Sequence, residues 1–213
     1  MTVTMLPVSV LAVEINHIID ITGMTVDAIG EAISEALNGH DTAVVTGAVY
    51  NVVDVLELII PEGKTLRWDA EYEAGSSLAS GSALLKLTDS SKGTLKIGAQ
   101  GILSGGNNTA ILTENGSATH IEVLGKVYNT ANPTILSNGA DITITIGNGG
   151  EVIAEGSNRT IHSNGNVTID GGTVKNTSNS STAEVIYMEG TDKTITVENC
   201  GEVIAEGDNS AIF

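Results

Sequence analysis

The chain has 213 residues, of which 41% are apolar and 3% aromatic, and its Ile, Val, Leu, Ala and 25 glycines are typical of short strands joined by tight turns. Its 26 acidic and 9 basic residues give a formal net charge of −17, which argues against nucleic acids as partners because phosphate backbones repel such a polyanion. The single cysteine, Cys200, excludes a disulfide framework and a thiolate metal site, and we expect it to be a small core residue near a strand end.

The first twelve residues resemble part of an export signal. Met1 to Ala12 are apolar and uncharged and end in Val-Leu-Ala, the small-residue pattern of a signal-peptidase site. No basic segment precedes the apolar run, so residues 1–12 are interpreted as a signal-peptide remnant, with an ordinary first strand as the alternative. No later run approaches the ~18 apolar residues of a membrane span. The sequence therefore predicts a secreted or cell-surface protein with no membrane span in the mature chain.

A helix is predicted within residues 13–43, after an N-terminal strand. Thr25 is a suitable N-cap, and Asn38-Gly39 provides a stop signal. One face of the helix carries Val26, Ile29, Ile33 and Leu37. We expect this amphipathic helix, over residues 25–37, to cover the open end of a strand stack, because an uncovered end exposes both a hydrophobic core and unpaired backbone.

An internal repeat determines the predicted fold of the rest of the chain. Residues 143–162 read TITIGNGGEVIAEGSNRTIH, and residues 194–213 read TITVENCGEVIAEGDNSAIF, with 13 of 20 positions identical at an offset of 51. A weaker half-period, with units starting at Gly93, Ser117, Ala140, Asn166 and Lys193, contains three short strands per unit. Strands this short are stable only when equivalent strands stack in register.

The sequence therefore predicts an all-β fold, a three-sided right-handed parallel β-helix (a single-stranded solenoid) over residues 44–213, with regular rungs from residue 93 on and an N-terminal capping α-helix. The first inward column is expected to contain Ile97, Val123, Ile146, Ile169 and Val197. The second is expected to contain Leu103, Val127, Val152, Val174 and Val203. The third is expected to contain Ile111, Ile135, Ile161, either Val185 or Ile186, and Ile212. Gly and Asn are expected to supply positive φ at the corners.

Less regular rungs are predicted upstream. Val44-Val45 and Val49 indicate a partial rung. Residues 58–60, 65–68 and 83–87 indicate one further rung, with a long corner loop from Glu71 to Ser82.

The order of these segments resembles a known group of proteins. An export signal and a capping helix are followed by Gly-His-Asp-Thr-Ala-Val-Val-Thr-Gly, then by Leu-Ile-Ile-Pro-Glu-Gly-Lys-Thr-Leu-Arg-Trp, and then by Gly-rich rungs. This order is similar to that of secreted β-helix surface proteins of Gram-positive gut bacteria, whose scaffold is pectate-lyase-like. The resemblance covers residues 1–213 and implies an extracellular, carbohydrate-facing setting. It transfers no site residue.

Catalysis on this scaffold would require carboxylates and bases from neighbouring rungs to converge on one outer face. On the first face Glu122 is the one carboxylate expected among the outward positions, and the chain has only two arginines, Arg67 and Arg159. His120 and His162 are expected on different faces, without a second His or Cys at ligand spacing, and both are interpreted as surface histidines. We therefore predict no catalytic site, no metal site and no cofactor.

Glu155 and Glu206 occupy equivalent corners two rungs apart, about 10 Å from each other if rungs are stacked 4.8 Å apart. That separation is too long for the two carboxyl groups to share a proton, so both are interpreted as solvated turn residues.

The third face carries the candidate binding residues. If the third column points inward, its neighbours Leu112, Leu136, His162, Tyr187 and Phe213 point outward as a largely apolar stripe, which usually marks a contact surface. The alternative is a register shifted by one residue, in which these side chains belong to the core. This stripe, or the uncapped C-terminal rung, is also expected to promote self-association.

Two classes of function remain. The first is a non-catalytic extracellular module, a spacer or an adhesin-like binder of glycan or protein. The second is a partial or inactive polysaccharide lyase or glycoside hydrolase-like β-helix whose active site lies outside this chain.

Overall fold

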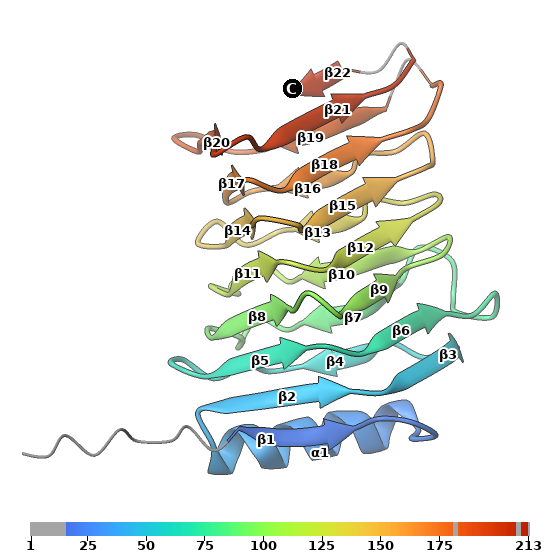
Figure 1. Cartoon of the computed structure of the whole chain (residues 1–213), viewed down its shortest axis with the longest axis vertical. Coiled ribbons are helices and arrows are strands. Elements are labelled where there is room, and N and C mark those ends of the chain that lie inside the picture. The colour runs from blue at the N-terminus through green and yellow to red at the C-terminus, as the bar shows by residue number, and fades with distance from the viewer. Residues whose placement is uncertain (1–15, 181–182, 208–209, 213) are drawn as a thin grey trace, which may run out of the picture.

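The computed structural model describes residues 16–180, 183–207 and 210–212, and within them three parallel sheets wind into a three-sided β-helix (Figure 1). The first face contains β1 (His17–Asp20), β2 (Thr42–Thr46), β5 (Thr65–Trp68), β8 (Thr94–Ile97), β11 (His120–Val123), β14 (Thr143–Ile146), β17 (Asn166–Asp170) and β20 (Ile195–Glu198). The second face contains β3 (Ala48–Val52), β6 (Glu71–Ala74), β9 (Ile102–Ser104), β12 (Lys126–Asn129), β15 (Glu151–Ala154), β18 (Thr173–Asn176) and β21 (Glu202–Ala205). The third face contains β4 (Leu56–Leu58), β7 (Ala83–Leu87), β10 (Thr109–Thr113), β13 (Ile135–Ser137), β16 (Ile161–Ser163), β19 (Glu184–Met188) and β22 (Ser210–Ile212).

The predicted fold class is confirmed. From β2 on, each coil contributes one strand to every face, whereas β1 belongs to the first face alone and is followed by the helix. Neighbouring strands within a face pair in parallel. In Figure 1 the first and second faces cross the front from left to right as the chain climbs, and the third face lies behind them. The coil is therefore right-handed, in agreement with the usual hand of parallel crossovers.

The core is built from the predicted columns. On the first face Ile97 pairs with Val123, then Ile146, then Ile169, and these four side chains are fully buried. The second-face column also has the predicted register, with Leu103, Val127, Val152 and Val174 buried. On the third face the column continues through Ile186 rather than Val185, because Ile161 pairs with Ile186.

The last member of the first column departs from the prediction. Val197 has the expected register opposite Ile169 but is 46% exposed. Its register is correct, and its exposure follows from its place in the last coil, over which no strand of the described residues lies.

The helix α1 (Val26–Gly39) closes the opposite end of the coil. The Thr25 hydroxyl accepts a hydrogen bond from the Ala28 N–H, which satisfies one of the free donors of the first turn. Ile29, Ile33, Ala36 and Leu37 are buried against the first coil, while Val26 is only partly buried. The helix thus covers the bore as predicted, and it lies at the lower end of Figure 1.

Glycine is needed at one corner for close approach rather than for a positive φ. Gly150 follows the first-face strand β14, and a Cβ on it would lie only 2.1 Å from the Val123 carbonyl oxygen of the coil below. Its neighbour Gly149 supplies the positive φ, at 81°. This corner thus uses Gly149 for the positive φ expected of corner glycines and Gly150 for the close approach of two coils.

Two upstream expectations are corrected. Residues 71–74 form β6 rather than part of a loop, because Tyr72 fills the inward position that Leu or Val occupies on other coils of the second face. The third-face strand of the first coil is β4 at residues 56–58, two residues earlier than expected, and Ile60 instead donates its N–H to the Ser91 hydroxyl. Residues 1–12, interpreted as a signal remnant, lie outside the described residues.

Candidate functional site

The predicted stripe lies on the outer surface of the third face. Leu112 pairs with Leu136, Leu136 with His162, and His162 with Tyr187, so the four residues form one in-register row. The neighbouring Ile residues of the same strands are fully buried, which shows that the alternative register is wrong. The fifth residue of the stripe, Phe213, lies outside the described residues.

This row is less exposed than the sequence suggested. All four side chains are partly buried, and the side chain of His162 is only 16% exposed. Side chains that stand on consecutive coils cover one another, because the coils are only about 4.8 Å apart. The row is therefore a packed, ordered surface.

An arginine that the sequence analysis did not assign to this face completes the upper part of the row. The Arg159 guanidinium lies over the Tyr187 ring, with its Cζ 3.6 Å from the ring centroid. Its Nε is 2.6 Å from the Glu184 carboxylate, so a charge-assisted bond orients the guanidinium for cation–π contact. The arrangement fixes Tyr187 and Arg159 as one unit.

His162 joins this unit through both ring nitrogens. Its Nε2 lies 2.9 Å from the Glu189 carboxylate, and its Nδ1 lies 3.4 Å from an Nη1 of Arg159. A neutral imidazole with the proton on Nε2 satisfies both contacts, since Nδ1 then accepts from Arg159. The ring also meets Tyr187 edge-on, with centroids 5.0 Å apart. The upper row thus presents aromatic surface bordered by two carboxylates.

The lower end of the same row is charged. Leu112 pairs with Lys86 in β7, and Lys86 pairs with Glu57 in β4. The Lys86 ammonium bridges Glu114, at 2.7 Å, and Glu57, at 3.0 Å. Hydrogen bonds to Glu114 and Glu57 raise the pKa of Lys86, and the bond from Lys86 lowers the pKa of Glu114. From bottom to top the row therefore runs from an ion-pair ladder through leucine to aromatic side chains.

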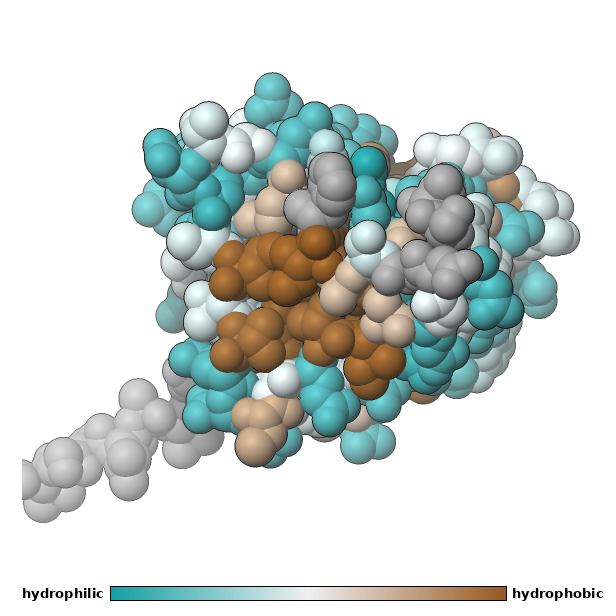
Figure 2. Space-filling view, turned by 90° about the horizontal axis from the view of Figure 1, so that it is seen from above, coloured by the Kyte–Doolittle hydropathy of each residue, from teal (hydrophilic) through white to brown (hydrophobic). Residues whose placement is uncertain are grey.

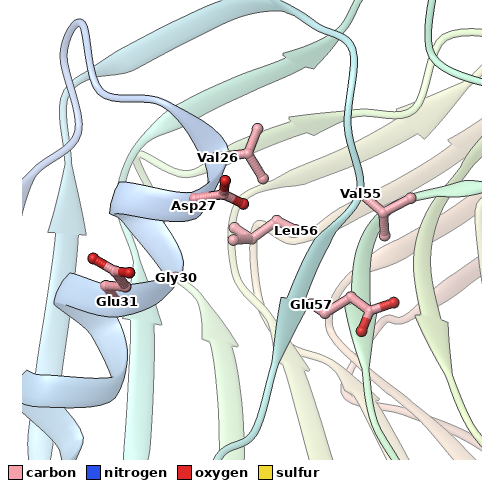
Figure 3. A pocket seen from close by; sticks show the side chains of 7 residues that line it. All are labelled: Val26, Asp27, Gly30, Glu31, Val55, Leu56 and Glu57. Carbon is pink, nitrogen blue, oxygen red and sulfur yellow. The ribbon is translucent and has the colours of Figure 1, made fainter.

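An acidic groove lies below the row, between α1 and β4. It has a volume of about 470 Å³ and is lined by Val26, Asp27, Gly30 and Glu31 of the helix and by Val55, Leu56 and Glu57 (Figure 3). Glu57 is already paired with Lys86, whereas Asp27 and Glu31 project from the helix as Figure 3 shows. Because its carboxylates repel anions, this groove favours neutral or cationic ligands.

The first face carries more carboxylates than the sequence analysis expected. Glu122 pairs with Lys96 at 2.8 Å, as its predicted outward position allows. Asp170 and Glu198 are also register partners at the ends of β17 and β20, so the expectation of a single carboxylate is wrong. They were missed because β17 extends one residue further than the alternation suggested.

Other candidate residues have structural partners. His120 lies on the first face, where its Nδ1 is 2.6 Å from the Thr143 hydroxyl, and it is thus on a different face from His162 as predicted. Glu206 pairs with Lys175 at 2.5 Å. Cys200 is exposed in the turn after β20, at a φ of 64°, so the expectation of a core cysteine is wrong.

Among residues 16–180, 183–207 and 210–212, no group of three or more His, Cys, Asp or Glu side chains is arranged to hold a metal ion. The helix in this described part is too short and too polar to cross a membrane. Comparison with protein-family models, curated proteins and solved structures finds no match to this chain.

Proposed function

We propose that this chain is a non-catalytic, extracellular or cell-surface β-helix module that binds a linear glycan along its third face. The observation that carries the proposal is the in-register row Leu112, Leu136, His162 and Tyr187. The resemblance of the segment order to secreted surface proteins of Gram-positive gut bacteria, whose scaffold is pectate-lyase-like, supports the extracellular setting.

The spacing of the row favours a polymer over a compact ligand. One side chain is presented per coil, at intervals of about 4.8 Å along the stack. A linear glycan repeats its own contacts at a similar interval, so successive sugars can meet successive side chains. A protein partner would need no such periodicity, and this is why we favour the glycan.

The chemistry of the upper row also suits a sugar. Glycans present C–H faces that pack on apolar and aromatic surfaces, and hydroxyl groups that exchange hydrogen bonds with carboxylates and guanidinium groups. Tyr187 and Leu136 supply an apolar surface on which the C–H faces of a sugar can pack. Glu184 and Glu189 lie beside this surface and supply hydrogen-bond acceptors for sugar hydroxyl groups. Because Arg159 already orients Tyr187, little side-chain entropy is lost on binding.

The proposal is tested by affinity electrophoresis in gels that contain neutral or acidic plant and bacterial polysaccharides. The parent should be retarded by at least one polymer, and Leu136→Glu combined with Tyr187→Glu should abolish the retardation. Thr145→Glu combined with Thr168→Glu is the matched control, because both threonines point outward from adjacent coils of the first face.

The same polymers report on catalysis. Release of reducing ends or of unsaturated uronates by the parent would overturn the non-catalytic assignment and favour the lyase or hydrolase alternative. Equal retardation of the parent and the third-face double variant would remove this face as the binding surface.

A further inference from the structure

The middle of the third-face row carries no charge. Leu112 and Leu136 are register partners on β10 and β13, and neither strand contains a charged residue. Figure 2, in which the coil is seen from above, shows hydrophobic residues at its centre and mostly hydrophilic residues around its outside. The two outward leucines are thus an apolar exception on a largely polar outer surface.

The lower end of the row has a cation, but its charge is already compensated. Lys86 is the one Lys or Arg on the third-face strands that the structure describes. Its ammonium lies 2.7 Å from the Glu114 carboxylate and 3.0 Å from the Glu57 carboxylate. Two carboxylates thus share one ammonium, so this end has an excess of one negative charge.

The upper end of the row repeats this arrangement. The Arg159 guanidinium is held by Glu184 at 2.6 Å and is covered by the Tyr187 ring, whose centroid is 3.6 Å from its Cζ. The His162 ring lies 2.9 Å from the carboxylate of Glu189, a side chain that is 58% exposed. Because a neutral imidazole adds no positive charge, the charge of Glu189 is an excess negative charge at this end as well.

This distribution of charge disfavours a glycan with an acidic group on every sugar. A uronate or sulfate that loses water on binding needs a cation or several hydrogen-bond donors in exchange. Lys86 and Arg159 are already paired with carboxylates, and the exposed carboxylates of Glu57 and Glu189 would repel an anionic ligand. The net charge of −17 acts in the same direction over longer distances.

A glycan with an ammonium group on every sugar fits the middle of the row poorly. The carboxylates at the two ends would attract it, but an ammonium beside Leu112 or Leu136 would lose water without gaining a partner. An uncharged sugar avoids this cost, because its C–H faces pack on the leucines and its hydroxyl groups can donate to the carboxylates at either end.

We infer that the glycan bound by the third face is uncharged, a polymer of neutral hexoses or pentoses or of N-acetylated amino sugars. This inference rests on the proposed function, because it names the class of ligand for the same face. The ion pairs at the two ends determine specificity, since they keep Lys86 and Arg159 from binding acidic groups. Leu112 and Leu136 determine it in the middle, since they offer no partner to a charged group.

Affinity electrophoresis with pairs of polymers that share a backbone and differ in charge tests the inference. The pairs are hydroxyethylcellulose with carboxymethylcellulose, fully methyl-esterified polygalacturonate with polygalacturonate, and glycol chitin with glycol chitosan. In each pair that retards the parent, the charged member should bind at least about tenfold more weakly than the uncharged one. Retardation by the uncharged member should be the same at low salt and at about 1 M NaCl, where the Debye length falls to about 3 Å, because the ligand has no charge to screen.

Glu57→Gln combined with Glu114→Gln tests the role of the lower ion pairs, because the two amides keep the shape of the carboxylates and release the Lys86 ammonium. This variant should bind the acidic member of a retarding pair at least about tenfold more tightly than the parent does, and the uncharged member equally well. Glu71→Gln combined with Glu73→Gln is the matched control, because it removes the same charge from two outward positions of β6 on the second face.

The failure of this inference differs from the failure of the proposed function. If a charged member retards the parent as strongly as the uncharged one, and Leu136→Glu combined with Tyr187→Glu abolishes that retardation, the third face binds a charged glycan and only the inference is overturned. If no polymer retards the parent, or if the double variant is retarded equally, the proposed function is overturned and the inference with it. No gain in the variant that releases Lys86, or an equal gain in its control, would overturn the role of the lower ion pairs.

Discussion

Truncation of two valines in one inward column measures the asymmetry of the stack. Val123 and Val197 belong to the same first-face column, yet Val123 is fully buried and Val197 is 46% exposed. Val→Ala removes two methyl groups, worth about 0.8 kcal/mol each when buried. At Val123 a cavity adds about 1 kcal/mol, so the free energy of unfolding should fall by about 2.5 kcal/mol.

At Val197 about half of the transfer term applies and no closed cavity forms, so Val197→Ala should cost about 0.8 kcal/mol. Guanidinium denaturation followed by circular dichroism compares the two variants, at protein concentrations where the chain is monomeric. Because terminal coils of a solenoid make contacts with one neighbouring coil only, we expect a smaller cost at Val197 than at Val123. Equal costs at the two positions would show that Val197 is as well covered as Val123. That result would refute the claim that the last coil, β20 to β22, leaves its inward side chains exposed.

Three further substitutions probe the cap, the core and a corner. Ile33→Asp should expose the bore and produce aggregates in light scattering, whereas Ser34→Asp, on the exposed side of α1, should remain monodisperse. Tyr72→Phe should leave the free energy of unfolding unchanged or raise it by about 1 kcal/mol, because the buried hydroxyl finds no hydrogen-bond partner among the described residues. Burial raises the pKa of Tyr72, so the unfolded chain releases the hydroxyl proton before the folded chain does as pH rises through about 10. The free energy of unfolding of the parent should therefore fall above that pH. Denaturation curves of Tyr72→Phe should show a smaller fall. Gly150→Ala should lower the midpoint of thermal unfolding, at a cost of about 1–3 kcal/mol, because its Cβ overlaps a backbone carbonyl; an unchanged midpoint would contradict the close approach.

The regular part of the fold could be predicted from sequence because in-register stacking repeats the same inward residue type on every coil. Ile97, Val123 and Ile146 are recognisable as one column only through the half-period, and the structure places them in that register. β6 was missed because Glu71 and Glu73 are polar and Ala74 is small, and because its one large inward side chain, Tyr72, differs from the Leu and Val of other coils.

The candidate site was predictable where it lies on strands and not where it lies on corners. Leu112, Leu136, His162 and Tyr187 follow from alternation on β10, β13, β16 and β19. Arg159 comes from the turn before β16, whose length varies from coil to coil, so no period indicates which face its side chain reaches. The one available signal was its position three residues before His162.

The central claim, that the third face binds a glycan without cleaving it, is tested most directly by a printed glycan array probed with the labelled parent and with Leu136→Glu combined with Tyr187→Glu. The account predicts that the parent binds a family of linear oligosaccharides more strongly as their length increases, because longer chains meet more coils. The double variant should lose these signals, and the bound oligosaccharides should be recovered intact. An array on which the parent binds nothing, or on which both proteins give the same pattern, would contradict the account.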